Sequence, residues 1–104
     1  MPRSSTATDE RLPNPHPGEI LLLDFLEPMG LSQSALARAV AVPPRRINEI
    51  VLGKRAVTAD TDLRLTRYFG LTDGFFLRLQ AEHDLMARRR EIGGELDAIR
   101  PRAA

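Results

Sequence analysis

Two adjacent prolines, Pro43 and Pro44, stand between two short segments whose apolar residues repeat at helical spacing. The apolar residues before them fall at positions i, i+1 and i+4 and share one helix face: Leu36, Ala37 and Val40. Those after them fall at i, i+3 and i+4: Ile47, Ile50 and Val51. Proline lacks an N–H and fixes φ, so it ends one helix and is tolerated in the first turn of the next. The sequence therefore predicts two short helices that meet at a tight turn.

The ends of this helix pair carry the expected signals. Ser32 can cap the first helix, and Gly53 supplies the left-handed conformation that ends the second. The spacing that turns the isoleucines inward turns four polar side chains outward: Arg45, Arg46, Asn48 and Glu49. A unit of this form can place its second helix, predicted from about Pro44 to Leu52, in a DNA major groove about 12 Å wide.

The distribution of charge favours the same interpretation. The whole chain has a net charge of only +1. Between Leu31 and Val57, however, five basic residues stand against Glu49 alone, which gives that segment a net charge of +4. Local positive charge is what binding to a phosphate backbone requires.

Three further helices complete an all-α fold of five helices, since no stretch alternates apolar and polar residues as a strand does. The first begins at Pro17 and ends between Pro28 and Gly30. The fourth is capped by Thr58, has Asp60 and Asp62 in its first turn, and ends at Gly70. Its predicted inner face consists of Leu63, Leu65 and Phe69. The fifth opens at Thr72 and Asp73 and reaches about Ile92.

The length of 104 residues suits one small domain with tails. Residues 1–14 are polar and proline-rich, and we expect a disordered arm there. Residues 15–92 form the predicted domain, and residues 93–104, with two adjacent glycines, a flexible tail.

Several classes of function are disfavoured by composition. The chain has no cysteine, and its two histidines, His16 and His83, lack neighbours at metal-site spacing, so we expect no metal and no cofactor. No nucleophile, base and orienting group converge, so we expect no enzyme and no catalytic residue. The start lacks a signal peptide's apolar core and the apolar runs are too short for a bilayer, which predicts a soluble, cytoplasmic protein without membrane contact.

The predicted fifth helix has more apolar surface than one core contact needs. One stripe, at spacings of three and four, consists of Phe76, Leu79, His83 and Met86. A second, at spacings of four, consists of Leu77, Ala81 and Leu85. We expect one stripe to pack inward and the other to contact a second copy, and we assign the dimer contact to the first. The alternative is that both stripes serve the monomer core.

The segment HPGEILLLDFLEPMGLSQSALARAVAVPPRRINEIVLGKRAVTADTDLRL, followed by FFLRLQAEHDL, resembles the phage-repressor-like helix-turn-helix domains. Within that family it is similar to the HigA-type antitoxins of bacterial toxin–antitoxin modules. The resemblance covers roughly His16 to Met86, and HPGEIL and FFLRLQAEHDL are its more specific parts. It implies a five-helix fold, a homodimer on palindromic operator DNA and repression of the module's own promoter. It also implies a toxin partner similar to the HigB-like and RelE-like messenger ribonucleases, neutralised by direct contact.

The resemblance also assigns site residues. Those that match the family's phosphate-contacting positions are Ser32, Gln33, Lys54 and Arg55. Those that match the face presented to base edges are Arg45, Arg46, Asn48 and Glu49. Arginine can bridge guanine O6 and N7, asparagine can pair with adenine, and glutamate can accept from cytosine N4. Glu49 has the alternative role of orienting a neighbouring arginine.

The chain departs from the family pattern at the turn. Ala41 stands where glycine is common, so the backbone there either avoids positive φ or tolerates strain. Pro43 and Pro44 replace polar capping residues, which moves the predicted base contacts to Arg45 and beyond. Two alternative functions remain: a transcription regulator without a toxin partner, and a helical protein-interaction module that does not bind DNA.

Overall fold

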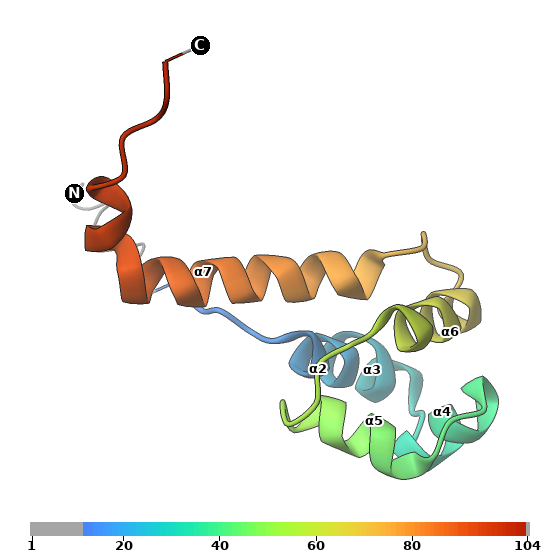
Figure 1. The fold of residues 1–104 in the computed structure, drawn as a ribbon. Coiled ribbons are helices and arrows are strands. Elements are labelled where there is room, and N and C mark those ends of the chain that lie inside the picture. Colours follow the sequence, from blue (N-terminus) through green and yellow to red (C-terminus); the bar gives the residue numbers. More distant parts are fainter. Residues whose placement is uncertain (1–11, 104) are drawn as a thin grey trace.

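The computed structural model describes residues 12–103, and every regular element within them is a helix (Figure 1). The first helical run consists of three consecutive pieces, α2 (Pro17–Ile20), the π-helical η1 (Leu21–Leu26) and α3 (Glu27–Met29). It is followed by α4 (Gln33–Val40), α5 (Pro44–Val51), α6 (Ala59–Phe69) and α7 (Phe75–Asp97). Counted with the first run as one helix, this is the predicted all-α arrangement of five helices. Residues 1–11, most of the predicted arm, lie outside the described residues.

The first helical run ends at Gly30, within the stop that the sequence predicted. Gly30 adopts a left-handed conformation with φ 61°. Pro28 lies inside the run, in α3. A proline in a regular α-helix collides with the carbonyl four residues earlier, and the wider π-helical turn of η1 directly precedes α3, whose second residue is Pro28.

The helix pair around the two prolines is confirmed. The Ser32 hydroxyl caps α4 by accepting a hydrogen bond from the backbone N–H of Ala35 at 3.0 Å. Pro44 is the first residue of α5, and α4 and α5 pack against each other (Figure 1). Ala41 takes a left-handed conformation, φ 60° and ψ 49°, so the turn tolerates strain instead of avoiding positive φ.

A single core joins the five helices. It is formed by fully or nearly fully buried apolar residues: Leu21, Leu26, Leu36, Ala37, Val40, Val42, Ile47, Ile50, Val51, Val57, Leu65 and Phe76. The prediction that Leu63 faces inward is wrong, since its side chain is 50% exposed. Leu63 and Leu65 are two residues apart, and residues at that spacing lie on different sides of a helix.

The α7 helix begins and ends differently from the prediction. Gly74, with φ 90°, precedes α7, and Thr72 does not cap it. The helix continues to Asp97, beyond the predicted end near Ile92, because Gly93 and Gly94 stay helical. At Ile92 the backbone leaves helical values (φ −118°, ψ 17°), and Figure 1 shows α7 changing direction towards its C-terminal end. Within residues 12–103, α7 and the other helices lack the apolar length that a membrane span requires.

Candidate nucleic-acid interface

The Glu49 carboxylate on α5 holds two arginines, Arg45 on the outer face of α5 and Arg55 in the loop that follows it. Arg45 Nε donates to Glu49 Oε2 at 2.9 Å, and Arg55 Nε donates to Glu49 Oε1 at 2.9 Å. Arg55 Nη2 also lies 2.8 Å from the same Oε1 atom. The hydrogen bond from Arg45 and then that from Arg55 lower the pKa of Glu49. Glu49 therefore stays ionised at neutral pH and keeps both guanidinium groups at the surface.

A second carboxylate holds Arg46. Arg46 Nη1 and Arg64 Nε both donate to Asp60 Oδ2 at 3.0 Å. The hydrogen bond from Arg64 is the largest cause of the lowered pKa of Asp60, and Arg46 adds to it. Arg64 Nη1 also donates to the backbone carbonyls of Val40 at 2.9 Å and Ala41 at 3.3 Å. This network ties α5 and the turn to α6, a role for Asp60 and Arg64 that no local sequence pattern revealed.

Asn48 is joined to Gln33 across the helix pair. Asn48 Nδ2 donates to Gln33 Oε1 at 3.2 Å. A predicted base-reading residue and a predicted phosphate-contacting residue thus lie side by side. Ser32 is at the start of α4, and Lys54 and Arg55 are exposed after the end of α5. All eight predicted DNA-contacting residues are therefore on or beside the two helices of the pair.

The segment His16-Pro17-Gly18-Glu19 anchors α2 on the end of α5. His16 Nδ1 accepts a hydrogen bond from the Gly18 N–H at 3.1 Å, and the His16 N–H donates to Glu19 Oε1 at 3.1 Å, which forms a capping box. A Cβ atom added at Gly18 would lie 1.8 Å from the carbonyl oxygen of Ile50. The HPGE motif is thus a docking element for α5. This element was not predicted from the sequence, and the signal that could have revealed it is the glutamate three residues after the cap.

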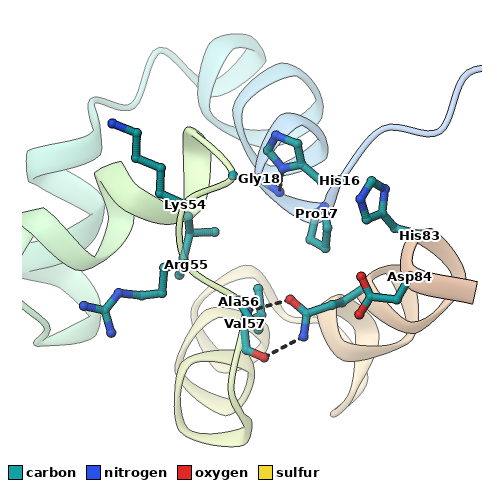
Figure 2. Close-up of a pocket in the computed structure, with 12 residues that line it drawn as sticks. His16, Pro17, Gly18, Lys54, Arg55, Ala56, Val57, His83 and Asp84 are labelled. Carbon is teal, nitrogen blue, oxygen red and sulfur yellow. Dashed lines mark hydrogen bonds between the residues drawn. The ribbon is translucent and has the colours of Figure 1, made fainter. Parts of the chain in front are cut away.

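The loop that carries Lys54 and Arg55 lies over a cavity of about 200 Å³, shown in Figure 2. Gln80 on α7 holds this loop at both polar groups of Val57. The Val57 N–H donates to Gln80 Oε1 at 2.6 Å, and Gln80 Nε2 donates to the Val57 carbonyl at 2.9 Å. His16 and His83 meet edge to face in the same region, with ring centroids 6.1 Å apart. The loop is therefore held by Gln80 of α7 and lies next to His16, the cap of α2.

The predicted dimer stripe on α7 faces the chain's own interior. Phe76 is completely buried in the core and has no surface left for a second copy, so its assignment to a dimer contact is wrong. His83 is part-buried: its Nδ1 lies 3.0 Å from the Asn14 carbonyl oxygen, and Asn14 Nδ2 donates to the His83 carbonyl at 3.0 Å. Leu79 and Met86 are half-buried. On the other stripe Leu85 is 58% exposed.

Comparisons with known sequences find the same architecture. A helix-turn-helix family profile matches residues 22–76, more than half of the chain. The chain is 52% identical to virulence-associated protein I of Dichelobacter nodosus over 82 residues, which cover 79% of this chain and 76% of that protein. It is 33% identical to antitoxin HigA-1 of Vibrio cholerae over 84 residues, 81% of this chain and 79% of the relative.

Solved structures with a similar fold likewise include antitoxins. The fold is similar to that of Pseudomonas aeruginosa antitoxin HigA, solved with the higBA promoter, with a TM-score of 0.79, 37% identity and coverage of 88% of this chain and 100% of that one. It is also similar to antitoxin GraA in complex with its operator, with a TM-score of 0.80, 36% identity and coverage of 89% and 95%.

Proposed function

Because this chain belongs to the HigA-type antitoxins of the helix-turn-helix family, a group of regulators rather than enzymes, we propose that it binds operator DNA in the cytoplasm and represses its own promoter. The observation that carries the proposal is the arginine-bearing outer face of α5, on a chain whose structural relatives were solved with promoter and operator DNA. On this proposal α5 enters the major groove.

We expect two kinds of DNA contact, one with base edges and one with phosphates. Arg45, Arg46 and Asn48 project from the outer side of α5 and suit hydrogen bonding to base edges. The surrounding residues, at the start of α4 and after α5, suit phosphate contacts, which set the register without reading sequence: Ser32, Gln33, Lys54 and Arg55. Phosphate contacts also make the affinity fall steeply as salt rises.

The proposal includes a homodimer on a palindromic operator. One short recognition helix offers few base contacts. Two half-sites one helical turn apart, each bound by one copy, multiply the preference for the operator over other DNA. Since the Phe76 stripe packs inward, we assign the contact between copies to the outer stripe of α7 around Leu85. Binding to such an operator requires that this contact set the two α5 helices about one helical turn of DNA apart.

The proposal also includes a toxin partner. The relatives HigA-1 of Vibrio cholerae and HigA of Pseudomonas aeruginosa are antitoxins, and a HigB-like, RelE-like messenger ribonuclease is the partner that this group implies. Co-expression of the chain with the open reading frame beside its gene tests this part. A stable complex that relieves the toxicity of that neighbour is expected. If the two proteins do not co-purify, the chain is a regulator without a toxin.

The test of DNA binding is a titration of fluorescent DNA from upstream of the gene, at two salt concentrations. The wild type is compared with Arg45→Ala plus Arg46→Ala, and with Arg88→Ala plus Arg89→Ala, which removes the same charge from α7. We expect specific, salt-sensitive binding that the first pair abolishes and the second pair retains. Absence of salt-dependent binding by the wild type would leave the protein-interaction module as the better description.

A further inference from the structure

We propose that Glu49 is a positioning residue that gives Arg45 and Arg55 different tasks: it orients Arg45 toward a base and Arg55 toward the DNA backbone. This inference rests on the proposed operator binding. It follows from the contact that both arginines make with the Glu49 carboxylate and from their positions, Arg45 on α5 and Arg55 in the loop after it.

Arg45 meets Glu49 through its Nε atom. That hydrogen bond, 2.9 Å to Glu49 Oε2, comes from the side of the guanidinium nearest the helix. Within residues 12–103 the terminal nitrogens of Arg45 have no other partner, and its side chain is 84% exposed. Two parallel terminal N–H groups are the donor pair that bridges guanine O6 and N7. The carboxylate thus stiffens Arg45 while leaving its base-reading edge open.

Arg55 meets Glu49 in a different way. Both Nε and Nη2 of Arg55 approach the single oxygen Oε1, at 2.9 Å and 2.8 Å. This contact uses the nitrogen pair that a bidentate base contact from the side would need. The outer edge of the Arg55 guanidinium, formed by Nη1 and the second N–H of Nη2, stays open as it does in Arg45. Because Arg55 follows α5 in the chain, it lies where a backbone contact is expected.

A direct contact of Glu49 with cytosine is the competing role. The side chain of Glu49 is only 22% exposed, and each of its oxygens already accepts from an arginine. Cytosine N4 would have to replace one of these charge-assisted hydrogen bonds, which are about twice as strong as neutral ones. The positioning role keeps both bonds in place when DNA binds.

The experiment measures operator preference, the ratio of dissociation constants for a scrambled duplex and for the upstream operator, by fluorescence anisotropy. The variants are Glu49→Gln, Arg45→Ala and the double variant. We expect Glu49→Gln to reduce operator preference about tenfold and to leave or raise affinity for the scrambled duplex, since a negative charge is removed. In the Arg45→Ala background the same change is expected to have little further effect. Glu91→Gln is the matched control, because Glu91 forms a similar exposed ion pair with Arg88 on α7.

Single-base replacements in the operator separate the roles. If Glu49 positions Arg45, Glu49→Gln and Arg45→Ala lose discrimination at the same guanine. Loss at a separate cytosine, or an equal loss in the Arg45→Ala background, shows that Glu49 reads a base itself and overturns the proposal. Unchanged operator preference in Glu49→Gln overturns the positioning role alone. A wild type without operator preference overturns the proposed function, and this inference with it.

Discussion

The Oδ1 atom of Asp62 accepts a hydrogen bond from the backbone N–H of Phe76 at 2.9 Å, and both residues are almost completely buried. The same carboxylate also accepts from the N–H groups of Leu77 at 3.1 Å and Gly74 at 2.6 Å. A side chain of α6 thus satisfies the free N–H groups at the start of α7, where the helix dipole favours a negative charge. This contact joins α6, which also packs against α4, to the start of α7.

Replacing Asp62 with alanine is expected to destabilise the fold by about 2 to 4 kcal/mol, because one buried and two part-buried N–H groups lose their acceptor at once. Thermal and urea unfolding followed by circular dichroism measure the change. Asp73→Ala removes the same charge from the exposed turn before α7 and should shift stability by less than about 0.5 kcal/mol. Equal effects of the two variants would show that α7 begins without help from Asp62.

Gly18→Ala is expected to destabilise the protein by at least about 2 kcal/mol and to weaken DNA binding. The added Cβ would lie 1.8 Å from the Ile50 carbonyl oxygen, so α2 must move away from the end of α5. Gly93→Ala is the control, since open space surrounds Gly93 within α7. That change should stabilise by about 0.5 to 1 kcal/mol through helix propensity. A tolerated Gly18→Ala would mean that the HPGE segment does not position α5.

The elements predicted from the sequence were those whose signals are local. Ser32, the two prolines and Gly53 lie next to the helix ends that they define, and the spacing of isoleucines sets the buried face of α5. Those features sufficed for the fold class and for the position of α5.

Features that depend on contacts between distant segments were missed. Asp62 was expected only to favour the start of its own helix, whereas it caps α7 twelve residues later. The inward direction of the Phe76 stripe depends on how α7 lies across the core, which spacing within one helix does not specify. The ion pairs Arg46–Asp60 and Arg55–Glu49 likewise become evident only when α5, its following loop and α6 are placed together.

Ala41→Gly is expected to stabilise the protein by about 0.5 to 1 kcal/mol. The backbone at Ala41 has φ 60°, a left-handed conformation that glycine adopts without a steric penalty. The unfolded chain gains some freedom with glycine, which offsets part of the relief. Ala39→Gly, inside α4, should instead destabilise by about 1 kcal/mol. If both variants destabilise equally in chemical unfolding, Ala41 is not strained.

Acid should remove the stabilising effect of the Glu49 and Asp60 ion pairs. Their arginine partners hold both pKa values below the ordinary 4.5 and 3.8, so the folded state favours the charged forms. The resulting stability is present above the ordinary values and is lost as pH falls through the lowered ones. The melting temperature of the wild type should therefore exceed that of Glu49→Gln plus Asp60→Asn by a constant margin from about pH 5 to 8. The margin should narrow as the pH falls below these ordinary values, and a margin that stays constant throughout acid titration would contradict the ionic origin.

Leu85→Glu is expected to convert a homodimer into a monomer. Leu85 is 58% exposed on the outer stripe of α7, where a second copy would bury it and where a charge would have to be desolvated. Light scattering after size exclusion should give a mass near twice 11.6 kDa for the wild type and near 11.6 kDa for the variant. Leu23→Glu is the matched control, because Leu23 is 53% exposed on η1 and should leave the dimer intact. A dimer that survives Leu85→Glu but dissociates in Leu23→Glu would move the interface to the first helical run, and with it the spacing of the two recognition helices on DNA.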